Sequence, residues 1–127
     1  MSSARKGMAE ANVVLTNPTH FAVALRYRPG LDAAPVVVAR GRGDVALAIK
    51  ALAKENAVHT LEYPQLTRAI YFTTRTGKTV SEDLYVAVAA ILAFVFRLET
   101  ALAGEMAQPV VQVPAAKRFN ADGIRAA

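Results

Sequence analysis

The chain has 127 residues, of which 54% are hydrophobic and 20% are charged, and its formal net charge is +5. This length and hydrophobic content predict one compact domain with a core of its own. Because the chain contains no cysteine, it can form neither a disulfide framework nor a thiolate zinc site, and it suits a reducing compartment.

At the start of the chain, residues 1–11 are small and polar, with Met8 as the only large apolar residue after the initiator, and they predict a flexible or helical lead-in. An apolar, β-branched run at 13–16 and an alternating run at 21–27 are each typical of a strand. Residues 17–20, Asn-Pro-Thr-His, separate the two runs. They predict a turn, because proline has no N–H for a sheet ladder and keeps the residue before it out of the helical region.

The Asn17–Pro18 bond has a particular reactivity. The side-chain amide nitrogen of Asn17 can attack the main-chain carbonyl carbon of the same residue, closing a succinimide and expelling the nitrogen of Pro18. A turn that holds the two atoms together could supply about 7 to 11 kcal/mol of the barrier. Backbone N–H groups near Thr19 could stabilise the oxyanion, and His20 could handle protons. Taken alone, however, an Asn-Pro pair more often marks an ordinary turn, and a lone histidine is more often structural.

The middle of the chain predicts a second pair of strands. Residues 36–40 are dense in valine, as a buried strand is, and Asp44 is expected to cap the helix that follows. Residues 58–62 read as a fourth strand, so we expect 36–40 and 58–62 to be parallel neighbours in a βαβ unit. The Gly-Arg-Gly sequence at 41–43 lacks the further residues of a phosphate loop and is interpreted as a turn. We expect no cofactor and no metal ion.

Two more helices are predicted. Pro64 suits the first turn of a helix ending near residue 73, and Thr79 or Ser81 is expected to cap a longer one that runs to about residue 102. Apolar residues cover nearly the whole circumference of the longer helix, so we expect it to pack centrally against the sheet. Its apolar run is shorter than the about 20 residues that span a bilayer, so it is interpreted as a buried helix.

From residue 104 the pattern is lost, and the prolines and alanines that follow predict a disordered tail over 104–127. The sequence therefore predicts a mixed α/β (α+β) fold, a single domain over 12–103 with a small four-stranded mixed sheet surrounded by about four helices.

The basic residues are scattered along the chain, which indicates solvated surface first and attraction to anionic lipid or an acidic protein second. No recognition helix, zinc finger or RNP-like aromatic pattern accompanies them, so we expect no nucleic-acid partner. The scattered set comprises Arg26, Arg28, Arg40, Arg42, Lys50, Lys54, Arg68, Arg75 and Lys78.

Five segments together resemble a known family. They are V-V-L-T-N-P-T-H-F-A-V-A-L-R-Y at 13–27, A-P-V-V-V-A-R-G at 34–41, D-V-A-L-A-I-K-A-L-A-K-E-N-A at 44–57, L-T-R-A-I-Y at 66–71 and L-Y-V-A-V-A-A-I-L-A-F-V-F at 84–96. In order and spacing, they are similar to the cytoplasmic domain of the FlhB/YscU/SpaS family, the export switch proteins of flagellar and injectisome type III secretion. The resemblance extends over residues 9–100 and looks more flagellar than injectisome.

The resemblance implies a single intramolecular self-cleavage between Asn17 and Pro18, in a catalytic turn with Thr19 and His20, followed by non-covalent association of the fragments. Such domains switch the specificity of export from early to later substrates. The implied partners are other export-gate membrane subunits, a secreted length-sensing protein and the exported substrates. It also implies a membrane region ahead of residues 1–11, which would then be a linker, and a place on the cytoplasmic face of the bacterial inner membrane.

In the family, early substrates are thought to dock on a small apolar patch, which the resemblance carries to Ala34, Pro35, Ala89 and Leu92. Packing in the core explains the same residues equally well. Two other functions also stay open, an injectisome homologue with the same role and a docking domain whose Asn-Pro bond stays intact. A hydrolase acting on other chains is disfavoured, because neither an H-E-x-x-H nor a G-x-S-x-G motif occurs.

Overall fold

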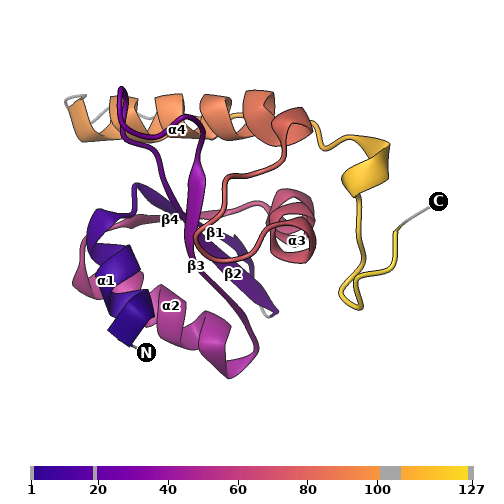
Figure 1. The fold of residues 1–127 in the computed structure, drawn as a ribbon, viewed down its shortest axis with the longest axis horizontal. Helices are drawn as coiled ribbons and strands as arrows, with labels where there is room; N and C mark the ends of the chain where they lie inside the picture. Colours follow the sequence, from indigo (N-terminus) through magenta and orange to yellow (C-terminus); the bar gives the residue numbers. More distant parts are fainter. Residues whose placement is uncertain (1, 19, 101–106, 126–127) are drawn as a thin grey trace.

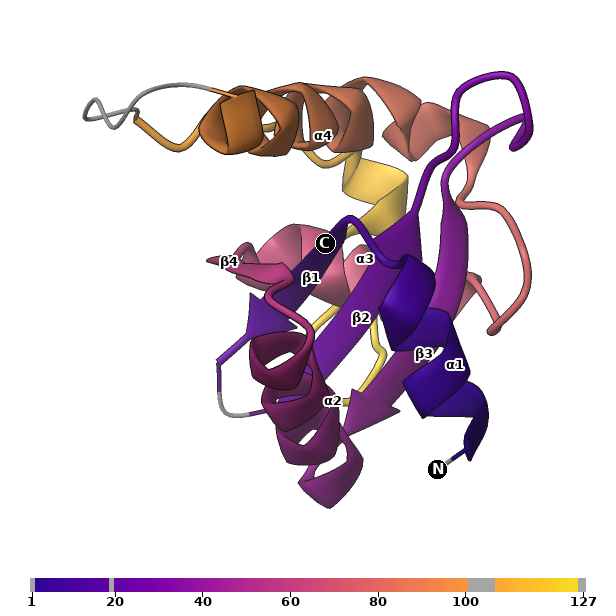
Figure 2. The ribbon, with the colours of Figure 1, turned by 90° about the vertical axis from the view of Figure 1, so that its left-hand side faces the viewer.

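The computed structural model describes residues 2–18, 20–100 and 107–125. In this part of the chain one four-stranded sheet lies between two groups of helices (Figures 1 and 2). This confirms the predicted four-stranded mixed sheet with about four helices. The strands are β1 (Val13–Asn17), β2 (Phe21–Arg26), β3 (Val36–Arg42) and β4 (His59–Glu62), and the helices are α1 (Ser2–Glu10), α2 (Asp44–Glu55), α3 (Pro64–Thr73) and α4 (Tyr85–Thr100).

Strand β1 lies inside the sheet, whose order is β3-β2-β1-β4. It pairs antiparallel with β2 and parallel with β4, while β2 pairs antiparallel with β3. All five residues of β1 are buried, because the strand has neighbours on both edges and helices over both faces. The β1–β2 hairpin is therefore the centre of the fold.

The prediction that residues 36–40 and 58–62 are parallel neighbours is wrong. Strands β3 and β4 lie at opposite edges of the sheet, separated by the hairpin. The short connection between β1 and β2 makes these two strands pair with each other, and β2 then takes β3 on its outer edge. Strand β4 is left with the free edge of β1, and its alternation of half-buried and exposed residues is that of an edge strand.

The two faces of the sheet carry different helices. Side chains of successive strand residues point to opposite faces, so Val13 and Leu15 pack with α3 and α4, whereas Val14 packs with α1 and α2. The lead-in is thus a helix docked on the domain, with Met8 fully buried. Figure 2 shows α1 lying along β3, and a Cβ on Gly7 would stand 2.4 Å from the Val38 carbonyl oxygen, so only glycine permits this approach.

The predicted cap of α2 is wrong, because Gly43, with φ of 58°, is its N-cap and Asp44 is already in its first turn. Of the two caps predicted for the longer helix, Ser81 is the N-cap of a 3₁₀ turn at Glu82–Leu84 that leads directly into α4, without a side-chain capping hydrogen bond. Val86 on α4 is 85% exposed, so this apolar helix packs by one face across the end of the domain instead of lying centrally. The predicted end near residue 102 lies outside the described residues.

The tail predicted to be disordered over 104–127 has a defined path where the structure describes it, at 107–125. Val113 is 2% exposed and joins the core on the α3 and α4 side of the sheet. The Lys117 ammonium lies 2.9 Å from a carboxylate oxygen of Asp83, just before α4. No sign of these contacts appears in the sequence, because one buried valine and a few polar contacts leave no periodic pattern.

We expect Leu15→Ala to lower the free energy of unfolding by about 2 to 5 kcal/mol, because it opens a cavity beneath the interior strand. Leu47→Ala is the control, since Leu47 is 59% exposed and its loss should change the value by about 0.5 kcal/mol or less. Urea unfolding of the two variants and of the unsubstituted chain measures both changes. Equal losses of unfolding free energy in the two variants would show that the buried side chains of β1 do not stabilise the fold more than exposed ones do.

Candidate functional site

The Asn-Pro sequence lies in the tight turn between β1 and β2. Asn17, the last residue of β1, is paired with Phe21, the first residue of β2. The main-chain N–H of His20 donates to the carbonyl oxygen of Asn17 at 2.9 Å. Asn17 is 9% exposed, whereas Pro18 and His20 are exposed. The turn therefore places the Asn17–Pro18 peptide bond near the surface, while Asn17 itself is held at the end of the sheet.

Of the four residues predicted for the catalytic turn, the structure places three together. Asn17, Pro18 and His20 form the turn, and Thr19 lies outside the described residues. The imidazole ring of His20 lies near the ring of Phe21, with centroids 6.2 Å apart. Phe21 in turn packs against the rings of Tyr71 and Phe72 in α3. This packing anchors the first residue of β2, and with it one end of the turn.

Helix α2 supports the turn from outside, which the sequence did not reveal. The Lys50 ammonium donates to the carbonyl oxygen of Pro18 at 2.8 Å, and the N–H of Gly43 donates to the carbonyl oxygen of His20 at 3.0 Å. A cavity of about 370 Å³ lies between Pro18 and the N-terminal half of α2. In the sequence, Lys50 was one of many scattered cations, and no local signal pointed to a residue so distant along the chain.

A second candidate site lies at the other end of the hairpin. Ala34 and Pro35, predicted for docking, come together with Ala89 and Leu92 of α4 in a pocket of about 310 Å³. Leu92 is 4% exposed, so it packs in the core and also lines the pocket. The remaining lining residues are Tyr27, Ala33, Tyr85, Ala93 and Phe96. The pocket is apolar apart from its tyrosine hydroxyls and main-chain groups, and it can accept an apolar side chain.

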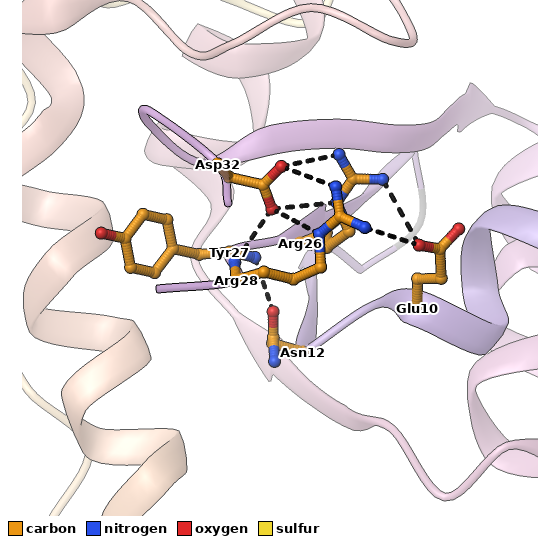
Figure 3. Close-up of polar contacts among 6 residues, drawn as sticks. All are labelled: Glu10, Asn12, Arg26, Tyr27, Arg28 and Asp32. Atoms are coloured by element: carbon orange, nitrogen blue, oxygen red, sulfur yellow. Dashed lines mark hydrogen bonds and ion pairs between the residues drawn. The ribbon is translucent and has the colours of Figure 1, made fainter. Parts of the chain in front are cut away.

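Charged residues gather beside this pocket, at the end of β2 (Figure 3). The carboxylate of Asp32 accepts hydrogen bonds from Arg26 and Arg28, and both guanidinium groups also approach the carboxylate of Glu10 in α1. The hydrogen bonds from Arg28, and then those from Arg26, hold the pKa of the Asp32 carboxyl well below its usual range. The Asp32 hydrogen bond likewise raises the pKa of Arg28.

Among the described residues, no cluster of three or more acidic or histidine side chains is arranged to hold a metal ion. Within the same residues, no helix combines the length and the hydropathy that crossing a membrane requires.

Two solved structures share this fold. The cytoplasmic domain of FlhB from Shewanella putrefaciens matches with a TM-score of 0.82 and 34% identity, over 91% of this chain and 93% of that one. A mutated EscU C-terminal domain matches with a TM-score of 0.72 and 27% identity, over 75% of this chain and 95% of that one. The fold is thus that of the FlhB and EscU domains.

Sequence comparison gives the family. The flagellar biosynthetic protein FlhB of Aquifex aeolicus is 46% identical over 86 residues, covering 68% of this chain and 25% of that protein. The FlhB of Salmonella typhimurium is 43% identical over 122 residues, covering 90% of this chain and 32% of that protein. The sequence model of the FlhB HrpN YscU SpaS family matches residues 1–95. The chain belongs to this family, and it spans between a quarter and a third of the length of these two relatives.

The charged cluster generates a pH prediction. Because the folded-state pKa of Asp32 is depressed, its contribution to stability is present above the unfolded-state value of about 3.9 and is lost as pH falls through the folded-state value. Asp32→Asn should therefore lower the free energy of unfolding by the same amount from pH 7 down to about 5, and the difference should shrink below about 4. Urea unfolding of both chains at each pH measures this difference. A difference that vanishes already between pH 7 and 5 would assign the effect to another group.

Proposed function

We propose that this chain is the self-cleaving cytoplasmic domain of a type III protein export apparatus of the flagellar kind. It cuts its own Asn17–Pro18 bond once and then serves as a docking surface that switches export from one class of substrate to the next. The hydrogen bond from the His20 N–H to the Asn17 carbonyl oxygen carries the proposal, because this oxygen becomes the oxyanion when Asn17 cyclises. Its 2.9 Å length is within the range of oxyanion donors.

The reaction needs no other chain. The side-chain amide nitrogen of Asn17 attacks the main-chain carbonyl carbon of Asn17 and gives up a proton. The carbon–nitrogen bond to Pro18 breaks, and the nitrogen of Pro18 takes up a proton and leaves as a secondary amine. Water afterwards opens the succinimide, which leaves a carboxyl group on the first fragment. His20, an exposed residue of the turn, is the candidate for exchanging these protons.

Both fragments stay in the fold after the bond breaks. Strand β1 ends at Asn17, but it remains paired with β2 on one edge and with β4 on the other. Its residues are buried on both faces, so dissociation would expose the centre of the core. Cleavage therefore adds a new carboxylate and a new amine at the turn and lets the two chain ends move apart, while the domain stays folded.

The comparisons support the flagellar assignment, since the relatives described above are flagellar biosynthetic proteins. Solved EscU C-terminal domains carry substitutions at an asparagine, to alanine or aspartate, and at the proline numbered directly after it. An asparagine followed by a proline also forms the turn here. The partners are export-gate membrane subunits, a secreted length-sensing protein and exported substrates, on the cytoplasmic face of the inner membrane, with residues 1–11 leading from the membrane region.

The apolar pocket beside α4 supports the docking part of the proposal. Ala34, Pro35, Ala89 and Leu92 come from segments far apart in the chain, and they meet in one concave, apolar surface. A hydrophobic side chain of an early export substrate fits such a surface, since burial of apolar area drives the association.

We expect Asn17→Ala to fold and to remain one chain on a denaturing gel, whereas the wild type separates into residues 1–17 and 18–127. The substitution removes the attacking nitrogen and keeps Pro18 and both strands. Asn17→Asp should cleave slowly at best, because a carboxylate must attack through oxygen. Intact mass of the denatured protein reads the outcome.

The opposite outcomes separate the alternatives. Cleavage of Asn17→Ala at the same bond, at the wild-type rate, would assign the cut to an outside protease. If the wild-type chain stays intact on prolonged incubation, the alternative that holds is a docking domain whose Asn-Pro bond is not cut.

For docking, we expect Ala89→Asp to weaken binding of a purified flagellar hook subunit by about tenfold or more, because it places a carboxylate in the apolar pocket. Val86→Asp is the matched control, on the same helix, 85% exposed and outside this pocket. Titration calorimetry measures both affinities, and circular dichroism checks folding. Equal affinities of the two variants would reject this pocket as the docking site.

A further inference from the structure

The pocket loop, residues 28–32, joins Tyr27 and Ala33, which both line the apolar pocket, and it is closed by a single buried carboxylate. The Asp32 side chain is 5% exposed. Its two oxygens accept from Arg26 Nε at 3.1 Å and Nη2 at 2.9 Å, and from Arg28 N at 2.9 Å, Nε at 3.1 Å and Nη2 at 3.0 Å. Paired contacts from a planar guanidinium fix direction as well as distance. Asp32 therefore determines how residues 28–32 leave the end of β2.

This closure sets the shape of the pocket. The N–H groups of Leu31 and Asp32 both donate to the carbonyl oxygen of Arg28, at 3.0 and 2.9 Å, so the loop is a compact turn. Ala33, next in the chain, lines the pocket, and so does Tyr27, which stands between the two arginines in the sequence. Figure 3 shows the Tyr27 side chain pointing away from the charged cluster, toward α4.

The same two arginines also reach α1. The carboxylate of Glu10, the last residue of that helix, lies 3.4 Å from Arg28 Nη1 and 3.6 Å from Arg26 Nη1. Two cations are thus shared between a carboxylate of the pocket loop and a carboxylate of the lead-in helix (Figure 3). If α1 leaves the sheet, both guanidinium groups lose one of their two acceptors, and only Asp32 still holds them.

We infer that Asp32, Arg26 and Arg28 are positioning residues for the apolar pocket, and that Glu10 couples the docking of α1 to the order of the pocket loop. The occupant of the pocket rests on the proposed function, but the coupling itself is a property of this chain. The regulatory consequence is that the segment leading into the domain controls the surface on which export substrates dock.

The contacts show which of the two carboxylates holds the arginines more firmly. The side chain of Asp32 is almost fully buried and bonded at up to 3.1 Å, whereas that of Glu10 is 40% exposed and approaches at 3.4 Å and beyond. Partly exposed pairs of this kind are weak and are screened by salt. Loss of Glu10 should therefore loosen the loop by a small factor, and loss of Asp32 by a larger one.

The test is amide hydrogen exchange on the whole 127-residue chain, read at Leu31 and Asp32, in the uncleaved Asn17→Ala background. Glu10→Gln should raise exchange at these two amides by about two- to fivefold at low salt. The matched control is Glu55→Gln, which removes the other α1 ion pair, 3.6 Å from Arg5, and has no contact with the pocket loop. This control should leave both amides at the wild-type rate.

Two outcomes would overturn the coupling. Unchanged exchange in Glu10→Gln would show that α1 does not act on the loop, and an equal rise in Glu55→Gln would show only that loosening α1 loosens the whole domain. Asp32→Asn gives a further check, because its effect on the loop must exceed that of Glu10→Gln. Binding of the hook subunit to Ala89→Asp decides separately whether the pocket is a docking site, so the two proposals can fail independently.

Discussion

The structure depends on the pairing of β1 along both of its edges. This strand bonds β2 in an antiparallel hairpin and β4 in a parallel ladder, and its five residues are buried between helices on both faces. A strand in this position cannot leave without exposing both halves of the core. The fold can therefore tolerate a chain break at the end of β1, since pairing and burial hold the strand without the covalent link.

The same pairing, together with helix α2, sets the geometry of the Asn-Pro turn. Because β1 and β2 are fixed in register up to Asn17 and Phe21, only three residues remain to close the turn, and the His20 N–H comes to the Asn17 carbonyl oxygen. Helix α2 adds contacts from the crossover that follows β3, through Lys50 and Gly43. The geometry that would orient Asn17 for attack is thus built by the sheet and its neighbours.

The hairpin also separates the two proposed tasks. The Asn-Pro turn closes one end of the hairpin, and the apolar pocket lies at its open end, where β2 runs into the loop closed by Asp32. The proposed cleavage turn and the proposed docking surface therefore use different residues. Both belong to the hairpin, and α1 packs on the neighbouring strand β3, with Glu10 reaching the arginines at the pocket end.

The sequence by itself determined the local elements. Alternation and β-branched runs predicted the strands, Pro64 predicted the start of α3, and the Asn-Pro pair predicted the turn between β1 and β2, because each is a property of a few consecutive residues. Tertiary structure decided the rest. The order of the strands depended on which edges the hairpin left free, and so 36–40 and 58–62 were wrongly expected to be neighbours. The contacts of Lys50 with the turn and of Glu10 with the pocket loop join residues far apart in the chain, and no periodicity records them. Such contacts exist only once the sheet has set the distances between its helices and loops.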